Sequence, residues 1–239
     1  KASKHINQMI IATTTDDADN KIVNTAKKEN VLFFRGSKEN VLERYYLAAR
    51  ENGLDIIVRI TSDCPCIDPE IVDEVISTHL NKQSDYTSNT LIRTYPVGLD
   101  VEVINLKTLE KCYNNAKKDL EKEHVTLYVH NNLDKFKTEN VSLKGTDKSQ
   151  IRITLDTEED YALLCSLFDY LYEIDEFFKY KDIIQLFEGK PWLILINKKI
   201  VAKKTFKTVD DEVKEALKIL ELQELKNARK LLQESLKKQ

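Results

Sequence analysis

Short apolar runs alternate with stretches of helical spacing along most of the chain. This alternation predicts βαβ units and a largely parallel sheet. The run at 55–61 is the strongest strand signal, and its apolar character predicts burial on both faces. Strands are expected at 9–13, 31–34, 55–61, 99–104, 137–143 and 151–155. Helices are expected at 16–28, 39–51, 69–80, 106–117, 119–131, 157–172 and 180–187, and residues 85–98 are expected to be irregular.

The pattern changes near residue 190. A lysine-rich connector at 203–207 leads into 208–236, where apolar side chains recur at roughly helical spacing. We therefore expect one long amphipathic helix there, and two domains, residues 1–189 and 190–239. Such a helix buries its apolar stripe against another surface. We favour a homo-oligomer contact over packing on the chain's own body.

Composition is typical of a globular protein in water. Hydrophobic residues make up 41% and charged residues 32%, with a net charge of −3. Acidic and basic residues are interleaved, so no basic stripe predicts nucleic-acid binding. No apolar run approaches the roughly 18 residues that span a bilayer, and no signal-peptide pattern opens the chain, which predicts a cytoplasmic protein without a membrane segment. The four cysteines lack zinc spacing and are expected to be reduced thiols.

Two acids lie at the carboxyl ends of predicted strands. Asp63 follows the run at 55–61, and Asp156 follows the run at 151–155. Ligands of open α/β sheets bind at this edge, and carboxylates are the ligands that Mg²⁺ prefers. A shared Mg²⁺ is one interpretation. The other is that each acid caps the helix after it, since Asp accepts hydrogen bonds from free N–H groups there.

The start of the chain lacks a phosphate-binding signal. Only 5 glycines occur, and they form no glycine-rich loop. In a doubly wound sheet, an earlier strand and a loop that binds the nucleotide usually precede a strand in the position of residues 9–13. We therefore expect that the chain starts one βα unit late.

Six motifs in order resemble the cytidylyltransferases of the spore-coat-polysaccharide type, relatives of the CMP-acylneuraminate and CMP-KDO synthetases. The similarity covers nearly the whole chain. The matching strings are IATTTDDAD from residue 11, FRGS from 34 with NVLERYY from 40, RITSDCP from 59, YPVGLDVEV from 95, EHVT from 123 and LDTEED from 155.

The resemblance implies an α/β, Rossmann-like nucleotidyltransferase fold with a mostly parallel sheet and a C-terminal helical extension. It implies that a sugar hydroxyl attacks the α-phosphate of CTP and that pyrophosphate leaves. By the same resemblance, Asp63 and Asp156 are the catalytic acids that bind Mg²⁺. The missing first unit is a departure from the family, because its loop would wrap the triphosphate.

The resemblance also assigns residues to the nucleotide. These are Ala12, Thr13 and Arg44. Thr13 alternatively caps the helix that follows it. Arg44 lies in a predicted helix, where a solvated or salt-bridged arginine is the common finding.

A second set of residues falls where the family binds the acceptor sugar. Gly98 would allow close approach of the backbone to a ligand. Asp100 and Glu102 would share one face of a strand, and a pair of acids on one face is hard to accommodate in an apolar core. Glu123 and His124 alternatively form an exposed pair at a helix start. The set is Tyr95, Gly98, Asp100, Glu102, Glu123 and His124.

Two other functions stay open at this point. A glycosyltransferase would hold a metal on a sugar-diphosphate donor, although Asp63 lacks the Asp-x-Asp pair common in those enzymes. A non-catalytic assembly subunit would explain the missing phosphate loop.

Overall fold

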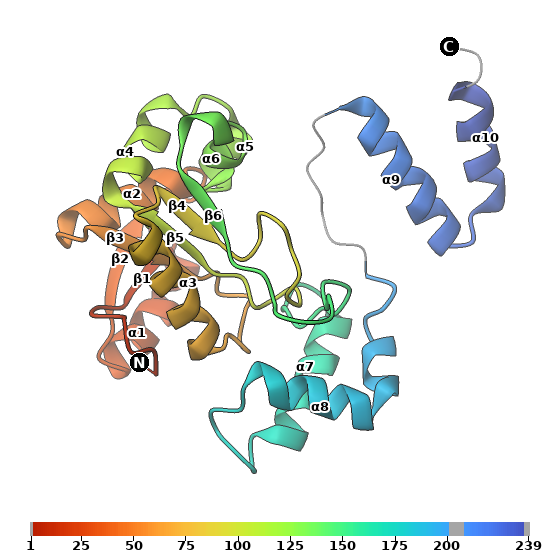
Figure 1. Ribbon diagram of the computed structural model, residues 1–239, viewed down its shortest axis with the longest axis horizontal. Coiled ribbons are helices and arrows are strands. Elements are labelled where there is room, and N and C mark those ends of the chain that lie inside the picture. The colour runs from red at the N-terminus through yellow and green to blue at the C-terminus, as the bar shows by residue number, and fades with distance from the viewer. Residues whose placement is uncertain (1, 201–207, 237–239) are drawn as a thin grey trace. The chain divides into compact units, whose positions relative to one another are not determined.

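The computed structural model describes residues 2–200 and 208–236, and the chain divides into two compact units, 1–155 and 156–239 (Figure 1). This division lies earlier than the predicted domain boundary between residues 189 and 190, which stays a prediction. The lysine-rich connector at 203–207 lies outside the described residues. Within the described ranges, no helix combines the length and apolar character needed to cross a bilayer.

The first unit opens with the expected βαβ element. Strands β1 (Ile10–Thr14) and β2 (Leu32–Gly36) pair in parallel, with Thr13 opposite Arg35. A short 3-10 turn (Asp17–Asp19) and helix α1 (Asn20–Lys28) connect them. Helix α2 (Val41–Glu51) contacts both strands, and Asn40 caps it by accepting a hydrogen bond from the Glu43 N–H.

A second sheet contains four strands in the order β3-β5-β4-β6. Their bounds are β3 Ile56–Arg59, β4 Tyr86–Ser88, β5 Glu102–Asn105 and β6 Thr138–Asn140. Strands β4 and β6 are parallel, as expected, but β5 runs antiparallel to both β3 and β4. Strand β4 also corrects the expectation that residues 85–98 are irregular throughout. Of β3, only Ile57 is fully buried, so the predicted burial of its whole run on both faces is wrong.

Helices cover both faces of this sheet. Helix α3 (Pro69–Lys82) contacts β4, β5 and β6, while α4 (Leu106–Asn115) contacts β5 and α2. The core between α2, α4 and the sheet includes Leu42, Ile57, Tyr86, Ile104, Leu109 and Val129. The expected helix 119–131 is two short helices, α5 (Asp119–Glu123) and α6 (Leu127–His130), followed by a 3-10 turn (Leu133–Lys135).

A buried ion pair joins strand β3 at one edge of the sheet to its neighbour β5. Arg59 on β3 lies directly opposite Glu102 on β5 and donates to it through Nη1. Glu102 Oε1 also accepts hydrogen bonds from Tyr86 Oη at 2.6 Å and Thr126 Oγ1 at 2.5 Å. Tyr86 Oη contacts His130 Nε2 at 3.0 Å, so the network extends to α6.

The partners of Glu102 decide its charge. Burial raises the pKa of this carboxyl group, but the Arg59 charge and the hydrogen bonds from Thr126, Tyr86 and Arg59 outweigh burial, so the pKa lies below its usual value. Burial and the adjacent Glu102 charge raise the pKa of Tyr86 well above 10. Glu102 is therefore ionised and Tyr86 neutral at pH 7, and the sheet contains one compensated ion pair.

The second unit is helical. Its helices are α7 (Glu158–Leu171), α8 (Tyr180–Gly189), a 3-10 turn (Pro191–Leu195), α9 (Val209–Leu222) and α10 (Lys226–Leu236). The expected single helix at 208–236 is therefore wrong, because the chain breaks at residues 223–225, where Glu224 has a φ of 59°. A left-handed residue ends a helix. The expected strand at 151–155, in the first unit, is reduced to one parallel bridge between Arg152 and Val97.

We predict that Glu102→Gln lowers the free energy of unfolding by about 3–5 kcal/mol at pH 7, because it leaves the Arg59 charge buried without its counter-charge. The pKa of Glu102 is lower in the folded protein than in the unfolded chain, where it is about 4.3. The charge of Glu102 therefore contributes its full share of the free energy of unfolding above about pH 4.3, and this share is lost as the pH falls through the folded-state pKa. Urea unfolding from pH 7 down to pH 3 measures both effects.

The matched control is Glu139→Gln on strand β6, which forms no ion pair among the described residues. It should change stability by less than about 0.5 kcal/mol. Wild-type stability and acid sensitivity in Glu102→Gln would contradict the role assigned to this network.

Candidate active site

Other residues cap the helices that follow Asp63 and Asp156. Asp68 Oδ1 accepts a hydrogen bond from the Glu70 N–H at 2.8 Å and caps α3. Thr157 and Asp160 form a capping box at the start of α7. The capping interpretation of Asp63 and Asp156 is therefore excluded, and neither helix explains why an acid stands at these positions.

The main chain of Asp63 is held by a distant segment. Its carbonyl oxygen accepts hydrogen bonds from the Leu155 N–H and from Thr154 Oγ1, each at 2.9 Å. The same segment pairs with the loop at 95–100: the Val97 N–H donates to the Ile151 carbonyl at 2.9 Å, and the Ile153 N–H donates to the Val97 carbonyl at 2.8 Å. Segment 151–155 therefore joins the loop of Asp63 to the loop of Gly98 and Asp100.

Gly98 lets these backbones meet. Its φ is +104°, and a Cβ at this position would lie 2.5 Å from the carbonyl oxygen of Ile153. A side chain is excluded both by the positive φ and by the neighbouring main chain. The group that approaches Gly98 closely in the structure is the main chain of Ile153 and Thr154, and the predicted contact of Gly98 with a ligand stays a prediction.

Arginine neutralises Asp100 in this cluster. Arg93 Nη1 and Nη2 donate to the two carboxylate oxygens of Asp100 at 2.5 and 2.6 Å. Burial lowers the pKa of Arg93, but the hydrogen bonds and charge of Asp100 raise it above its usual value. Because a carboxylate has about four lone-pair sites, two remain on Asp100 after the bidentate pair forms.

Asp63 differs from Asp100 in its surroundings. Its half-buried side chain forms no ion pair within residues 2–200 and 208–236, and Cys64 Sγ donates weakly to its Oδ1 at 3.6 Å. Burial, together with the charges of Asp63 and Asp100, raises the pKa of the Cys64 thiol to about 11, although Thr61 lowers it. Cys64 is thus neutral at pH 7, and the negative charge of Asp63 stays uncompensated by these neighbours.

The predicted nucleotide-binding residues of β1 adjoin a fixed loop. Thr13 Oγ1 and Thr14 Oγ1 donate to Asp19 Oδ2 at 2.8 and 2.6 Å, and Arg35 Nε donates to the Thr14 carbonyl at 2.8 Å. Hydrogen bonds from Thr14 and Thr13 lower the pKa of Asp19. Thr13 therefore orients Asp19 instead of capping a helix, and Ala12 is the preceding residue of the strand.

Arg44 lies on α2 next to the end of β2. Its Nη1 donates to the carbonyl of Ser37 at 2.8 Å, and a Cβ on Gly36 would lie 3.1 Å from its Cγ. Its Nε is buried and has no hydrogen-bond partner among the described residues. Arg44 forms no ion pair among the described residues, and its side chain is half-buried. Thr13 and Arg44 thus both lie at the carboxyl end of the β1–β2 pair.

The remaining predicted sugar contacts are spread over the unit. Tyr95 is buried, and its hydroxyl donates to Glu74 Oε2 at 3.3 Å. Glu123 ends α5 and His124 follows it, both exposed, so they stand at a helix end and not at a helix start. No hydrogen bond or ion pair among the described residues connects either of them to the Asp63 loop. Glu102 is buried, and its carboxylate accepts hydrogen bonds from Arg59, Tyr86 and Thr126.

Residues 1–200 match the protein family described as cytidylyltransferase. The chain belongs to the cytidylyltransferase family. This membership confirms the family that the sequence motifs resemble, and it implies transfer chemistry that uses CTP. Arg93, Asp19 and Thr154, which orient residues of the site, were not among the predicted site residues.

Similar proteins extend the comparison. Uncharacterized protein MJ1063 of Methanocaldococcus jannaschii is 34% identical over 215 residues, covering 88% of this chain and 85% of the relative. Spore coat polysaccharide biosynthesis protein SpsF of Bacillus subtilis is 32% identical over 167 residues, covering 69% of this chain and 68% of the relative.

A solved structure described as a cytidylyltransferase from Leptospira borgpetersenii serovar Hardjo-bovis matches with a TM-score of 0.78 and 34% identity, covering 85% of this chain and 84% of that chain. The α/β nucleotidyltransferase-like fold predicted from the sequence is thus confirmed.

We predict that Gly98→Ala destabilises the protein by about 1–3 kcal/mol more than Gly145→Ala. Gly145 is a matched control, because its φ of +108° gives the same backbone strain while a Cβ there has no atom within 4 Å. The excess reflects the clash with Ile153. Urea denaturation of the two variants measures this difference in the free energy of unfolding. Equal losses of stability would contradict the prediction, because segment 151–155 would then shift to accommodate the added methyl group without loss of stability.

Proposed function

We propose that this protein transfers CMP from CTP to a hydroxyl group of a sugar, with release of pyrophosphate, for polysaccharide or glycoconjugate synthesis. The sugar oxygen bonds to the α-phosphorus of CTP, the bond from that phosphorus to the oxygen that bridges to the β-phosphate breaks, pyrophosphate leaves with that oxygen, and the proton of the hydroxyl passes to solvent. Family membership and the similarity to the Bacillus spore coat protein support the proposal.

The observation that carries the proposal is the carboxylate of Asp63, which has no basic partner among the described residues and stands on a main chain that is held in place. Its main chain is fixed by Thr154 and Leu155, and its side chain is half-buried with only the neutral thiol of Cys64 beside it. Fixed carboxylates without a basic partner suit metal binding better than structural support.

Mg²⁺ fits the chemistry of these donors. Asp63 supplies hard carboxylate oxygens, and we assign the second ligand to Asp156 from the family resemblance; it directly follows Leu155 in the chain. When bound, Mg²⁺ supplies positive charge for phosphate oxygens. Among the described residues, no cluster of three or more acids, histidines or cysteines forms a closed site, so the substrate itself is expected to provide further oxygen ligands.

The other residues take roles that their contacts allow. We assign Ala12, Thr13 and Arg44 to the nucleotide. The buried Nε of Arg44 can donate a hydrogen bond to a bound ligand.

The acceptor sugar is assigned to a second group of residues. Asp100 keeps two lone-pair sites for a sugar hydroxyl, while Arg93 fixes the plane of its carboxylate. Glu102 is left to the support of the sheet, because its oxygens already bind Arg59, Tyr86 and Thr126. Tyr95, Gly98, Glu123 and His124 remain proposed acceptor contacts.

We predict that Asp63→Asn and Asp156→Asn each lower the rate of pyrophosphate release from CTP in the presence of the sugar on the order of 100-fold or more, because several kcal/mol of charge stabilisation is lost. Asparagine keeps the shape of the side chain but removes its charge. The assay uses the full-length gene product, CTP, Mg²⁺ and a panel of sugars, and a thermal shift with Mg²⁺ and CTP provides a second readout.

The matched controls are neighbouring acids with other roles. Asp68→Asn should keep near-native activity, because asparagine caps α3 as well as aspartate does, and Glu159 is an exposed residue of α7 whose change to Gln should also be silent. Near-native turnover in either site variant would remove that residue from the mechanism. Transfer from a sugar nucleotide without pyrophosphate release would instead indicate a glycosyltransferase.

A further inference from the structure

Two polar residues are buried in the described part of the second unit, residues 156–200 and 208–236, and they bind each other. Asp160 lies in the first turn of α7, and Asn197 follows the 3-10 turn Pro191–Leu195. Asn197 Nδ2 donates a hydrogen bond to Asp160 Oδ1 at 2.8 Å. Burying a carboxylate is costly, and the start of a helix does not require it.

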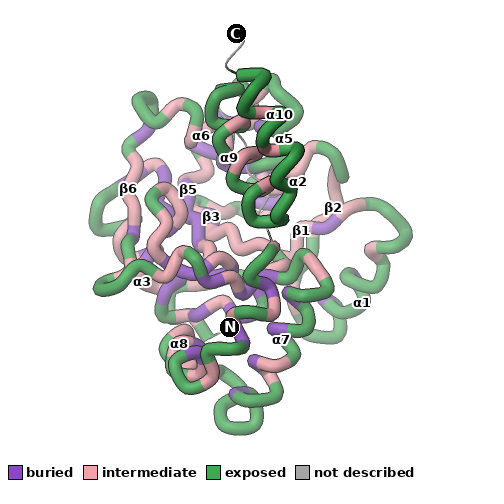
Figure 2. The backbone as a smooth tube through the Cα atoms, turned by 90° about the vertical axis from the view of Figure 1, so that its right-hand side faces the viewer, coloured by how far each residue is buried: buried purple, intermediate pink, exposed green. Residues whose placement is uncertain are grey.

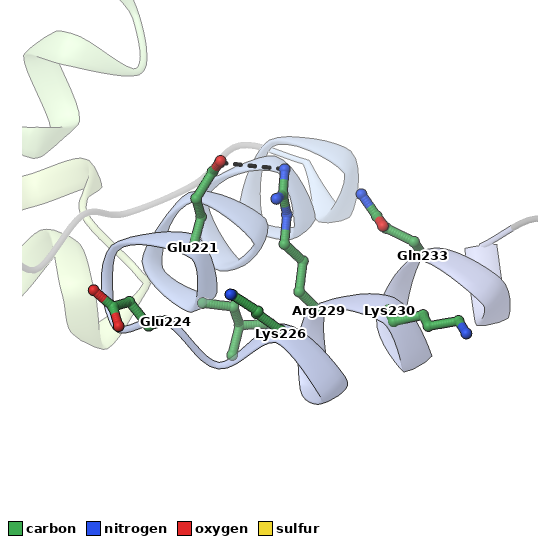
Figure 3. Close-up of a pocket in the computed structure, with 7 residues that line it drawn as sticks. Glu221, Glu224, Lys226, Arg229, Lys230 and Gln233 are labelled. Carbon is green, nitrogen blue, oxygen red and sulfur yellow. Dashed lines mark ion pairs between the residues drawn. The ribbon is translucent and has the colours of Figure 1, made fainter.

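Among the described residues, the other helices of this unit have no buried acid. Helix α8 has the same capping arrangement, in which Asp182 Oδ2 accepts the Lys179 N–H at 2.7 Å, but Asp182 is only half-buried. Helices α9 and α10 contain no buried residue, and Figure 2 colours them exposed or intermediate. Figure 3 shows Glu221 of α9 paired with Arg229 of α10 in a pocket that both helices line. The burial of Asp160 is therefore particular to the start of α7.

Asp160 holds the main chain on both sides of Asp156. Its Oδ2 accepts hydrogen bonds from the Asp156 N–H and the Thr157 N–H, each at 3.2 Å. The first N–H belongs to the planar peptide unit before the Asp156 Cα, and the second belongs to the unit after it. One oxygen atom thus fixes both planes, and with them the direction in which the side chain of Asp156 leaves the backbone. That side chain is exposed.

Asn197 fixes the orientation of the Asp160 carboxylate. An ionised carboxylate only accepts hydrogen bonds, so the contact uses the NH₂ group of Asn197. This donor comes from 37 residues later in the chain. It reaches α7 because the 3-10 turn before it contacts both α7 and α8 and buries Leu193. With Oδ1 held by Asn197, the carboxylate keeps Oδ2 directed at the two N–H groups.

We propose that Asp160 and Asn197 are positioning residues for Asp156, and that they hold its exposed carboxylate in the direction that a cation requires. This inference rests on the proposed function, because it takes Asp156 as a ligand of Mg²⁺. Both residues act through the main chain of Asp156, as Thr154 acts on the carbonyl of Asp63. Loss of a partner that orients a metal ligand typically changes metal affinity about 10- to 100-fold.

The first test titrates the full-length gene product with the Mn²⁺ complex of CTP, without sugar, and follows binding by water-proton relaxation. Asn197→Leu keeps the size of the side chain and leaves the capping box of α7 in place, but it removes the donor to Asp160. We expect the dissociation constant of the complex to rise about tenfold. Unchanged affinity in a folded Asn197→Leu variant overturns the proposal.

Asp160→Ala and Asp182→Ala form a matched pair, because each removes the acid of a capping box from a helix of the second unit. Both variants are expected to lower the urea midpoint, since each helix loses a cap. Only Asp160→Ala is expected to raise the dissociation constant of the Mn²⁺ complex, by about tenfold or more. Equal affinities in the two variants would show that Asp160 serves the helix alone.

An exchange of the two partners tests the geometry even where single variants lose stability. In Asp160→Asn with Asn197→Asp, the amide oxygen at position 160 still accepts the two N–H groups, and its NH₂ group donates to the carboxylate at position 197. We expect the affinity to return to within about threefold of wild type. A double variant that binds as weakly as Asn197→Leu would remove the role assigned to this pair.

Asp156→Asn separates this inference from the proposed function. Weaker binding in Asp156→Asn, together with wild-type binding in Asn197→Leu and Asp160→Ala, would overturn the inference and leave the proposed function intact. Wild-type binding in Asp156→Asn would remove the metal role of Asp156, and the positioning role with it.

Discussion

The architecture of the candidate site depends on the carbonyl group of Asp63, which accepts two hydrogen bonds from a segment about ninety residues later in the chain. That segment also pairs with the loop of Gly98, where the backbones approach so closely that no side chain fits between them. These contacts use main-chain atoms and one threonine, so they fix the acid without consuming its carboxylate. The carbonyl group of Asp63 thus serves the structure, and its carboxylate stays available for the proposed cation.

The acids of the first unit are distinguished by their partners. Glu102 and Asp100 each meet an arginine, Arg59 and Arg93, and Asp63 meets neither. A compensated carboxylate stabilises the sheet or orients a loop, whereas an uncompensated one attracts a cation. Acidic residues thus support the fold at one position and provide the proposed chemistry at another. Membership of the cytidylyltransferase family indicates that this chemistry uses CTP.

Local signals in the sequence predicted much of this structure. The helices α2, α3 and α7 and the β1–α1–β2 unit lie within a few residues of their expected positions, because their caps and apolar spacing are local. The antiparallel direction of β5 and the pairing of Glu102 with Arg59 depend on residues distant in sequence, which periodicity does not encode. Arg93 and Asp100 are near in sequence, but they pair across an irregular loop that has no periodic pattern. The breaks at 124–126 and 223–225 contain no glycine or proline, and Glu224 adopts a left-handed conformation without either signal. Asp63 was proposed because it follows an apolar strand-like run, whereas its lack of a basic partner among the described residues required coordinates.

The most direct test of the central assignment is a crystal structure of the protein with a non-reactive CTP analogue and Mn²⁺ in place of Mg²⁺. The account predicts an anomalous peak at about 2.1–2.2 Å from a carboxylate oxygen of Asp63, shared with the phosphates of the analogue. A peak bound by other acids, with Asp63 turned away from the nucleotide, would contradict it.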